Sequence, residues 1–333
     1  MILKPRPIPL NVLFCHALIP RLDPAHPKIP QIEKDLRSFL SGYRGEKTTD
    51  YHLAFINDKK HHLFGGIRLP HGEHFFQMDT PILSRKYILI LETKNFGGEL
   101  SFTPQQFSQT SYYGQRGYKD PIAQVTRHKE QLHDWLKTHH LPTDIPIIPL
   151  VVLSNPSAII KTNDPDILQK VCKVENLKNK IFELTSSYSE DILTDRSLKK
   201  ISNLLLKDDT PLYLGPQKTY GLSPLELFPG ARCHICHSYQ LVRKDRVWVC
   251  PHCLNHSKDA YFDALLDYFL FIKDTITNRE FREYLGIDSV KTASKLLTSL
   301  NLPTTGQKKG RIYHRPTDFL DQLEFRYNRL KDK

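Results

Sequence analysis

The sequence predicts an α/β chain in which a mixed β-sheet flanked by helices is followed by a helical segment, a zinc ribbon and a small winged-helix-like domain. Three observations support this prediction. The run at 87–91 is almost wholly apolar, as expected of a strand that is covered on both faces. Two C-x-x-C motifs lie in the second half of the chain, and a short helix, a glycine turn and a longer helix come after them.

The composition is that of a basic, globular protein. A chain of 333 residues suits two or three domains, and hydrophobic and charged fractions of 39% and 25% argue against long disorder. The net charge of +11 favours a polyanionic partner, with nucleic acid ahead of an anionic membrane surface. No apolar run approaches the roughly 18 residues of a membrane span, and the run between Pro9 and Pro20 is too short for a signal peptide. We therefore expect a soluble, cytoplasmic protein without a membrane partner.

The first half of the chain shows the periodicities of an α/β domain. Residues 1–30 are rich in proline and are expected to form an extended arm. The domain itself is expected at 31–160, and residues 41–45 should break its first helical stretch. Its predicted elements are two helices, a β meander, a third helix and a last buried strand, at 31–40, 46–55, 62–91, 122–137 and 147–153.

A charged pair follows the apolar strand. Glu92 and Lys94 are two residues apart, so on a strand both side chains point to the same face. Asp79 ends the preceding strand-like run, and a tight link through Pro81 would let Asp79 and Glu92 face each other across a hairpin. Two facing carboxylates need a cation, and oxygen ligands suit Mg²⁺ or Mn²⁺.

This set of groups would suit phosphodiester hydrolysis. A divalent ion polarises a phosphate and lowers the pKa of a bound water, and Lys94 could orient that water or offset charge in the transition state. Taken alone, however, an E-x-K pair is common and is usually a surface ion pair at the end of a strand.

Four ordered motifs resemble the nuclease-related domain, NERD, which is similar to the PD-(D/E)XK restriction-endonuclease-like superfamily. They are Tyr43-Arg44-Gly45-Glu46, Gln77-Met78-Asp79, Leu91-Glu92-Thr93-Lys94-Asn95-Phe96-Gly97-Gly98 and Asp120-Pro121-Ile122-Ala123-Gln124. The resemblance covers about residues 31–156 and implies a restriction-endonuclease-like mixed sheet. Thr80-Pro81 departs from the plain apolar strand that the family more often has after the aspartate.

The resemblance also implies roles for individual residues. Asp79 and Glu92 would bind the catalytic metal together with the backbone carbonyl of Thr93, and Lys94 would be the catalytic lysine. Glu46 would complete the acidic cluster, and Gln124 would project toward the site from the following helix. Without the family pattern, Glu46 and Gln124 would be ordinary helix residues. The nearby histidines are interpreted as solvated or hydrogen-bonded polar residues rather than ligands, at His61, His62, His71, His74, His128 and His133.

The cysteine motifs predict a zinc ribbon at 231–256, after a helical connecting region at 161–230. Four thiolates close the coordination of a tetrahedral Zn²⁺, so the site would be structural. A redox role would need only one of the two pairs and a thioredoxin-like βαβ surrounding. The predicted ligands are Cys233, Cys236, Cys250 and Cys253.

The last segment, at 257–333, is predicted to be a helix-turn-helix or winged-helix-like domain. Thr277 to Glu280 has the pattern of a capping box, and Gly286 makes the turn. The next helix should bury one face, made of Val290, Ala293, Leu296, Leu297 and Leu300. The alternative is a helical protein-interaction module. Basic residues on the second helix and on the wing are candidate nucleic-acid contacts, at Lys291, Lys295, Lys308, Lys309 and Arg311.

The sequence thus predicts a Mg²⁺- or Mn²⁺-dependent nuclease with a structural Zn²⁺, acting on DNA rather than RNA and cleaving within strands. Two alternatives stay open. One is a non-catalytic nucleic-acid-binding or regulatory protein that uses the nuclease-like domain as a scaffold, and the other is a nuclease that acts on RNA. A homodimer is a further expectation, because cutting both strands of a duplex usually needs two sites.

Overall fold

The computed structural model describes residues 1–56, 60–103, 105–212, 215–239 and 241–331, without the side chain of Lys309. It consists of two compact units. The first comprises Met1–Ile8 and Ser38–Leu212, and the second comprises Pro9–Arg37 and Tyr213–Lys333. Helix α2 (Ile29–Ala54) contributes residues to both units.

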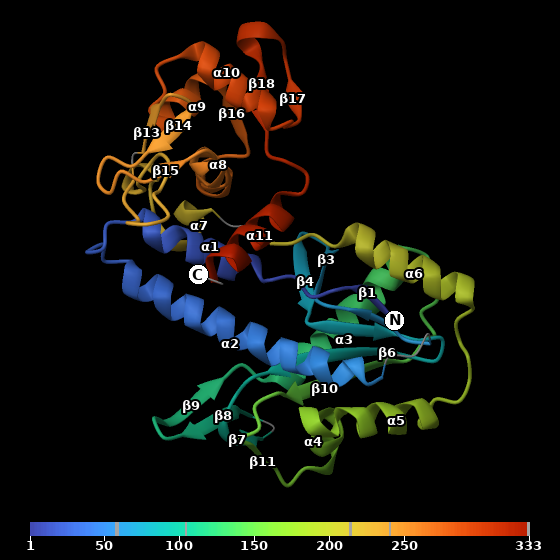
Figure 1. Ribbon diagram of the computed structural model, residues 1–333. Helices are drawn as coiled ribbons and strands as arrows, with labels where there is room; N and C mark the ends of the chain where they lie inside the picture. Colours follow the sequence, from blue (N-terminus) through green and yellow to red (C-terminus); the bar gives the residue numbers. More distant parts are fainter. Residues whose placement is uncertain (57–59, 104, 213–214, 240, 332–333) are drawn as a thin grey trace. The chain divides into compact units, whose positions relative to one another are not determined.

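The first unit is built on a mixed sheet, as predicted (Figure 1). Its described strands run in the order β1-β2-β5-β6-β10-β12, where β5 and β6 are antiparallel and β6, β10 and β12 are parallel. Their bounds are Ile2–Lys4, His62–Phe64, Thr80–Leu83, Ile88–Lys94, Ile147–Leu153 and Val171–Lys173. The buried strands β6 and β10 lie in the middle of this sheet, as their apolar sequences predict.

Alternate side chains of β6 serve two separate cores, one on each face of the sheet. Ile88 and Ile90 pack in the core that includes residues of α3 (Pro121–Thr138) and α6 (Asp195–Asp208). Leu89 and Leu91 pack in the core that includes residues of α2 and α5 (Leu177–Ser187). Because strand side chains alternate, Glu92 and Lys94 belong to the α3 face and Thr93 to the α2 face.

Two smaller sheets complete the first unit. Strands β3 (Ile67–His71) and β4 (His74–Met78) form a hairpin. The other sheet has the order β11-β7-β8-β9, with bounds Ala158–Lys161, Gly98–Phe102, Phe107–Ser111 and Gly114–Tyr118. The remaining helix of this unit is α4 (Pro165–Lys170), with a 3-10 turn η2 (Val174–Asn176) after β12.

Two local predictions for the start of the chain differ from the structure. The expected break at 41–45 is absent, and α2 runs through both of its glycines. Tertiary packing overrides the weak helix propensity of glycine here. Residues 1–30 also form regular structure rather than an extended arm, since β1 pairs with β2 and Leu10–Leu18 forms helix α1. Apolar side chains of α1, including Val12 and Leu18, become buried.

The second unit contains the cysteine motifs and the C-terminal helices. Its described elements, besides α1 and the start of α2, are η1 (Ile19–Arg21), α7 (Pro216–Tyr220), η3 (Pro224–Glu226), β13 (Val242–Lys244), β14 (Val247–Val249), β15 (His256–Ser257), α8 (Ala260–Phe271), β16 (Thr275–Thr277), α9 (Asn278–Leu285), α10 (Val290–Ser299), β17 (Thr304–Thr305), η4 (Lys308–Gly310), β18 (Ile312–His314) and α11 (Phe319–Lys331).

The C-terminal part has the element order of a winged helix. Its elements follow in the order α8-β16-α9-α10-β17-β18 (Figure 1). The three strands form a sheet of order β16-β18-β17, and β17 and β18 form the wing. The capping box at Thr277 and Glu280 is present, and Gly286 takes the left-handed conformation that ends α9. One detail was predicted wrongly: Val290 is exposed, because it occupies the first turn of α10, whereas Ala293 and Leu297 form the buried face.

Candidate functional site

The site in the first unit is built around the end of β6. Glu92 has only 2% of its surface exposed, and Lys94 is the last residue of the strand. The Lys94 Nζ donates a hydrogen bond to Glu92 Oε1 at 2.7 Å. The predicted same-face arrangement of the two side chains is therefore realised in an ion pair whose carboxylate is buried and whose lysine is partly exposed.

Asp79 lies between β4 and β5, immediately before the first residue of β5. Thr80 pairs with Leu91 in the antiparallel ladder, so Asp79 is level with Glu92 one step further along. Its Oδ2 accepts a hydrogen bond from the backbone N–H of Thr93 at 2.9 Å. The structure thus brings the predicted pair together. Pro81 lies within β5, however, and the connection between β5 and β6 is the turn at 84–87.

Gln124, on α3, completes this hydrogen-bond network. Its Nε2 donates to Glu92 Oε1 at 2.8 Å, and its Oε1 accepts from Lys94 Nζ at 3.1 Å. Asp120 caps the helix by accepting from the backbone N–H of Ile122. The side-chain amide of Gln124 therefore holds the Glu92 carboxylate and the Lys94 ammonium in one orientation.

Glu46 reaches the cluster from α2, and its partner is an arginine that no sequence motif indicated. Arg6 Nη1 donates to Glu46 Oε2 at 2.6 Å and to the backbone carbonyl of Asp79 at 2.9 Å. The same guanidinium binds both oxygens of Asp50, at 2.8 and 2.9 Å, and donates to the hydroxyl of Thr80. Arg6 follows β1 and lies outside every motif of the domain, so only the fold reveals its place.

His128 is the second residue that sequence reasoning missed. It lies one turn after Gln124 on α3, and it is buried, not solvated. Its Nδ1 lies 3.7 Å from Glu92 Oε2 and has no hydrogen-bond partner among the described residues. The i, i+4 spacing from Gln124 places both side chains on one face of the helix and was the available signal.

Burial and mutual proximity raise the pKa values of the acidic cluster. Burial, and then the charge of Asp79, raise the pKa of Glu92 to about 8 and that of Glu46 to about 7. Burial also raises the pKa of Asp79, against the opposing effects of the Thr93 hydrogen bond and of Lys94. Burial lowers the pKa of His128 to about 4, so a neutral imidazole faces Glu92 at neutral pH.

Carboxylates are the ligand type that binds a divalent metal ion, but among the described residues only the four cysteines at 233–253 have ligand atoms that all lie within 4.8 Å of one another. The buried oxygen Glu92 Oε2 has no hydrogen-bond partner among the described residues, and carboxylates that raise each other's pKa would both ionise beside a cation. In this arrangement Glu46 is paired with Arg6, and Glu92 with Lys94. Both carboxylates therefore already have a cationic partner within the protein. A hard oxygen-ligand set of this kind is typical of Mg²⁺ and Mn²⁺.

A glycine lets helix α2 approach the end of β6. A Cβ on Gly45 would lie 2.6 Å from Ser154 Oγ and 2.8 Å from Asn95 Cβ, closer than real side chains come. Asn95 in turn donates from Nδ2 to the backbone carbonyl of Ser41 on the same helix. The close approach brings Glu46, the next residue, to the acidic cluster.

The four cysteines of the second unit form a group that can hold a metal ion. Their sulfur atoms all lie within 4.8 Å of one another, with 3.5 Å between Cys233 and Cys253 and between Cys236 and Cys250. These distances exclude disulfide bonds, which need about 2.05 Å. Four thiolates around a tetrahedral Zn²⁺, at about 2.3 Å each, lie about 3.8 Å apart, so the cluster fits zinc.

The two knuckles of this cluster have the same backbone geometry. Backbone N–H groups donate from His237 to Cys233 and from Leu254 to Cys250, at 3.1 and 3.0 Å. Both donors adopt the left-handed conformation, with φ of 63° and 58°. The knuckles are joined through the sheet of β13, β14 and β15. The four-cysteine cluster is therefore consistent with the predicted zinc ribbon.

The candidate nucleic-acid contacts at the C-terminus are exposed where the structure describes them. Lys291 and Lys295 lie on the outer face of α10, and Lys308 and Arg311 lie in the wing between β17 and β18. The side chain of Lys309 lies outside the described residues. The basic side chains of α10 and of the wing are therefore accessible to solvent.

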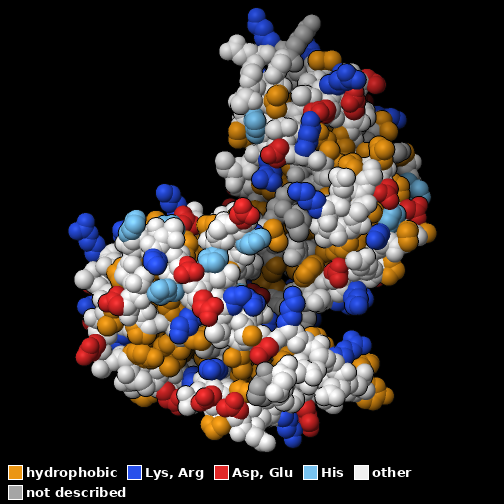
Figure 2. Space-filling model, turned by 180° about the vertical axis from the view of Figure 1, so that it is seen from behind, with side chains coloured by type: hydrophobic (Ala, Val, Ile, Leu, Met, Phe, Trp, Pro, Cys, Tyr) orange, Lys and Arg blue, Asp and Glu red, His pale blue; other side chains and the backbone are white. Residues whose placement is uncertain are grey.

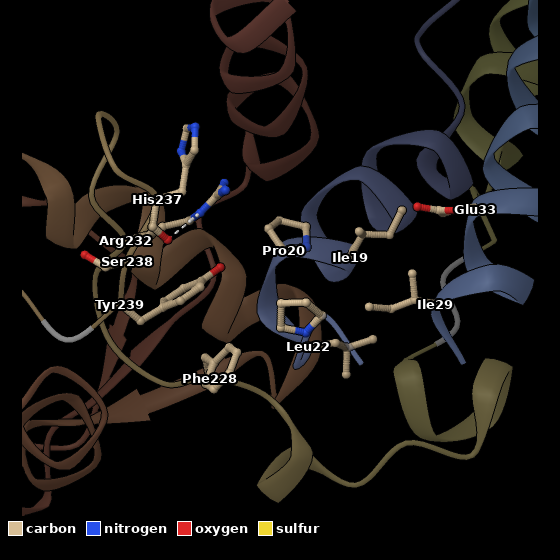
Figure 3. Close-up of a pocket in the computed structure, with 11 residues that line it drawn as sticks. Ile19, Pro20, Leu22, Ile29, Glu33, Phe228, Arg232, His237, Ser238 and Tyr239 are labelled. Atoms are coloured by element: carbon tan, nitrogen blue, oxygen red, sulfur yellow. Dashed lines mark hydrogen bonds between the residues drawn. The ribbon is translucent and has the colours of Figure 1, made fainter. Parts of the chain in front are cut away.

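A cavity of about 760 Å³ in the second unit offers different chemistry (Figure 3). Pro20, Leu22 and Ile29 line one side, and Tyr239 and Arg232 line the other. Phe228 stacks on Tyr239, with ring centroids 5.4 Å apart. Among its described lining residues the cavity has no pair of carboxylates, so it lacks the equipment present at the end of β6.

Comparison with known proteins identifies the domain that carries the acidic site. Residues 41–154 match the model of the NERD family, described as the nuclease-related domain. The resemblance predicted from the four motifs is therefore confirmed. The matched segment includes Glu46, Asp79, Glu92, Lys94 and Gln124, and it excludes Arg6. No curated protein and no solved structure matches the chain.

Membrane association through a spanning helix finds no support in the described part of the chain. None of its helices combines the length and apolar character needed to cross a bilayer.

Proposed function

We propose that this chain is a Mg²⁺- or Mn²⁺-dependent nuclease that hydrolyses phosphodiester bonds in DNA at the end of β6. The observation that carries the proposal is the position of Asp79, Lys94 and Gln124 around Glu92. Lys94 and Gln124 bind one oxygen of Glu92, and its other oxygen is buried without a hydrogen-bond partner among the described residues. These four residues lie within the segment that matches the nuclease-related domain. The net charge of +11 supports a polyanionic substrate.

Asp79, Glu92, Glu46 and the backbone carbonyl of Thr93 would hold the divalent ion. When bound, such an ion polarises a phosphate and lowers the pKa of water. In the absence of the ion, the raised pKa values of Glu92 and Glu46 mean that protons neutralise part of the cluster. Metal binding would release these protons, so affinity for the metal should increase with pH.

Lys94 is the proposed catalytic residue. Its ammonium lies at the strand end, partly exposed, and it can orient a water or offset the charge that develops on the phosphate. Gln124 restricts the Lys94 side chain through the bond at 3.1 Å, and it binds Glu92 at the same time. Arg6 is a positioning residue that fixes Glu46. Neutral His128 keeps a polar group beside Glu92 without adding positive charge.

Other parts of the chain would support this reaction. Zn²⁺ in the four-cysteine cluster would be structural, because four thiolates leave no position open for a substrate. Substrate would be held by the basic residues of the C-terminal helix and wing, Lys291, Lys295, Lys308, Lys309 and Arg311. Affinity for DNA should then fall steeply as salt concentration rises.

Cleavage of plasmid and linear DNA by the purified chain, with Mg²⁺ or Mn²⁺, tests the proposal. Lys94→Ala and Asp79→Ala should each abolish cleavage while DNA binding is retained, and Lys178→Ala, at an exposed position on α5, is the matched control that should cut like the wild type. Nicked circles would show that cleavage is internal. An RNA substrate run in parallel tests the RNA alternative.

The other outcomes are equally informative. A wild-type chain that binds DNA and RNA but cleaves neither would favour the non-catalytic binding protein. If both variants still cut, the activity lies elsewhere and the proposed site is refuted.

A further inference from the structure

We propose that the β8–β9 hairpin of the first unit binds an unpaired nucleic acid strand, with Tyr112 and Tyr113 stacking on its bases. The inference rests on the proposed function, because it assigns the kind of substrate that the site at the end of β6 receives. The evidence is two almost fully exposed tyrosines at the tip, a hairpin base that is anchored in the core, and two exposed basic residues, Arg116 and Lys119.

The tip of the hairpin exposes two aromatic side chains almost completely. Tyr112 is 98% exposed and Tyr113 is 85% exposed. Their rings contact each other edge to face, with centroids 5.5 Å apart, so they form one projecting aromatic surface. Isolated exposed apolar residues are ordinary, but adjacent bare aromatic rings at a projecting tip mark a contact surface.

The turn itself does not require tyrosine. Ser111 pairs with Gly114, which leaves Tyr112 and Tyr113 as the connecting residues. Gly114 supplies the left-handed conformation, with φ of 95°, and neither tyrosine has a positive φ. Glycine, asparagine, aspartate and proline are the residues that stabilise such turns. Local folding therefore gives no reason for two aromatic residues here.

The base of the hairpin is fixed to the core of the first unit. Phe102 and Phe107 are buried and contact each other, with centroids 4.7 Å apart. The side chain of Gln109 donates to the backbone carbonyl of Gly97 at 2.7 Å. Gly98, with φ of 81°, lets the strands approach so closely that a Cβ there would lie 2.4 Å from the carbonyl oxygen of Thr110. The tyrosines therefore stand on a rigid support.

One face of the hairpin leads from the tip to the candidate active site. The pairs Phe107 with Tyr118 and Gln109 with Arg116 share this face. Phe96, two residues after Lys94, packs on Tyr118 with ring centroids 4.7 Å apart. The hairpin therefore contacts a residue that lies two positions after the E-x-K pair.

The charge of the hairpin suits a phosphate backbone. Residues 103–119 contain Arg116 and Lys119 and no aspartate or glutamate, and both basic side chains are exposed. Figure 1 shows the hairpin projecting from the sheet of the first unit, and Figure 2 shows Lys or Arg side chains beside hydrophobic ones near its tip. Aromatic rings interleaved with cations are typical of surfaces that bind single strands without sequence preference.

These features favour an unpaired strand over a duplex. Every base offers a flat face on which tyrosine can stack, but in a duplex those faces are occupied by neighbouring base pairs. The proposed substrate class is therefore nucleic acid with a single-stranded segment, such as an overhang, a flap or a bubble.

Binding of a short single-stranded DNA that contains 2-aminopurine tests the inference, because stacking on tyrosine quenches this fluorescent base. The full chain carries Glu92→Gln and is measured without Mg²⁺ or Mn²⁺, so that cleavage cannot interfere. Replacing Tyr112→Ala together with Tyr113→Ala should weaken binding about 10- to 100-fold and remove the quenching. Tyr112→Phe with Tyr113→Phe keeps the rings and should bind nearly like the parent.

Phe182→Ala is the matched control, because Phe182 is an aromatic residue on α5 that is 73% exposed. It should leave binding unchanged. A blunt duplex should lose little affinity in the double alanine variant. Unchanged binding of the single strand, or equal loss for the duplex, would overturn the inference.

Two further arms separate this inference from other possibilities. Vesicles that contain phosphatidylserine should not bind in a tyrosine-dependent manner, and if they do while DNA does not, the tip is a membrane contact. A chain that binds DNA through the tyrosines but never cleaves it refutes the proposed nuclease activity and leaves this inference intact. A chain that cleaves normally but binds single strands without the tyrosines refutes this inference and leaves the proposed nuclease activity intact.

Discussion

The acidic cluster of the first unit and the cysteine cluster of the second both contain residue types that bind metal ions. They differ in whether the ligand atoms of the cluster already lie close enough together to surround an ion. The four sulfur atoms lie within 4.8 Å of one another and can close a tetrahedral site. The carboxylates are held apart by Arg6 and Lys94, and one oxygen of Glu92 has no hydrogen-bond partner among the described residues. A site closed by four thiolate ligands is suited to a structural metal ion. A site with carboxylate ligands and free coordination positions is suited to catalysis.

The largest expected effect tests the structural half of this contrast. Cys233→Ser or Cys250→Ser should remove one Zn²⁺ per chain and unfold the ribbon at 231–256, because binding of a structural zinc contributes about 10 kcal/mol or more to folding. Zinc content measured by atomic emission, together with protease sensitivity, checks this. Cys172→Ser, at an isolated buried cysteine, is the control and should retain the metal. A cysteine-to-serine variant in the ribbon with full zinc content would contradict the assignment.

The next effect tests the catalytic half. Glu92→Gln should reduce DNA cleavage by about a hundred- to thousandfold or more, because it removes a negative ligand from the proposed metal site. Zinc content should not change, which separates this site from the cysteines. Glu175→Gln, at an exposed glutamate in the same unit, should cleave at the wild-type rate. Equal activity in the two variants would place the reaction elsewhere.

The pH dependence of stability should reveal the raised pKa of Glu92. The folded-state pKa of Glu92 is raised to about 8, so the folded chain binds a proton that the unfolded chain releases near pH 4.5. The resulting stability is present below about pH 4.5 and is lost as pH rises through about 8, at about 1.4 kcal/mol for each unit of pKa difference. Urea unfolding of the protein without Mg²⁺ at pH 5.5, 7 and 8.5 measures this contribution.

Two additions identify the source of that pH dependence. Glu92→Gln should flatten the decrease, because glutamine does not titrate. Mg²⁺ should also flatten it, because the cation stabilises the ionised carboxylates. A decrease that is equally steep under all three conditions would show that other groups cause it.

The smallest effect concerns the packing that brings α2 to the acidic cluster. Gly45→Ala should destabilise the first unit by about 1–3 kcal/mol, because its Cβ would collide with Asn95 and Ser154. Gly42→Ala, in the same helix, meets nothing within 4 Å and should stabilise by up to about 1 kcal/mol. Thermal unfolding of the two variants measures the difference. Similar effects at both positions would show that α2 does not pack closely here.

Local sequence patterns were sufficient for the buried strands and the cysteine knuckles. The apolar runs of β6 and β10 have no face that could meet water, and so their burial follows from composition alone. The spacing of the four cysteines specifies two turns of the same geometry, because each knuckle is closed by contacts within a few residues. The capping box at Thr277 is equally local. These features depend on neighbours in sequence.

Only the tertiary structure decided which distant groups meet at the acidic cluster. The register that sets Asp79 beside Glu92, the approach of α2 through Gly45 and the position of Arg6 all depend on packing between elements far apart in the chain. His128 became part of the site for the same reason, since burial beside Glu92 and not its own sequence neighbours determines its environment. Residue type and spacing identify the chemical groups that a segment offers. Packing between distant segments determines which of these groups come together in one site.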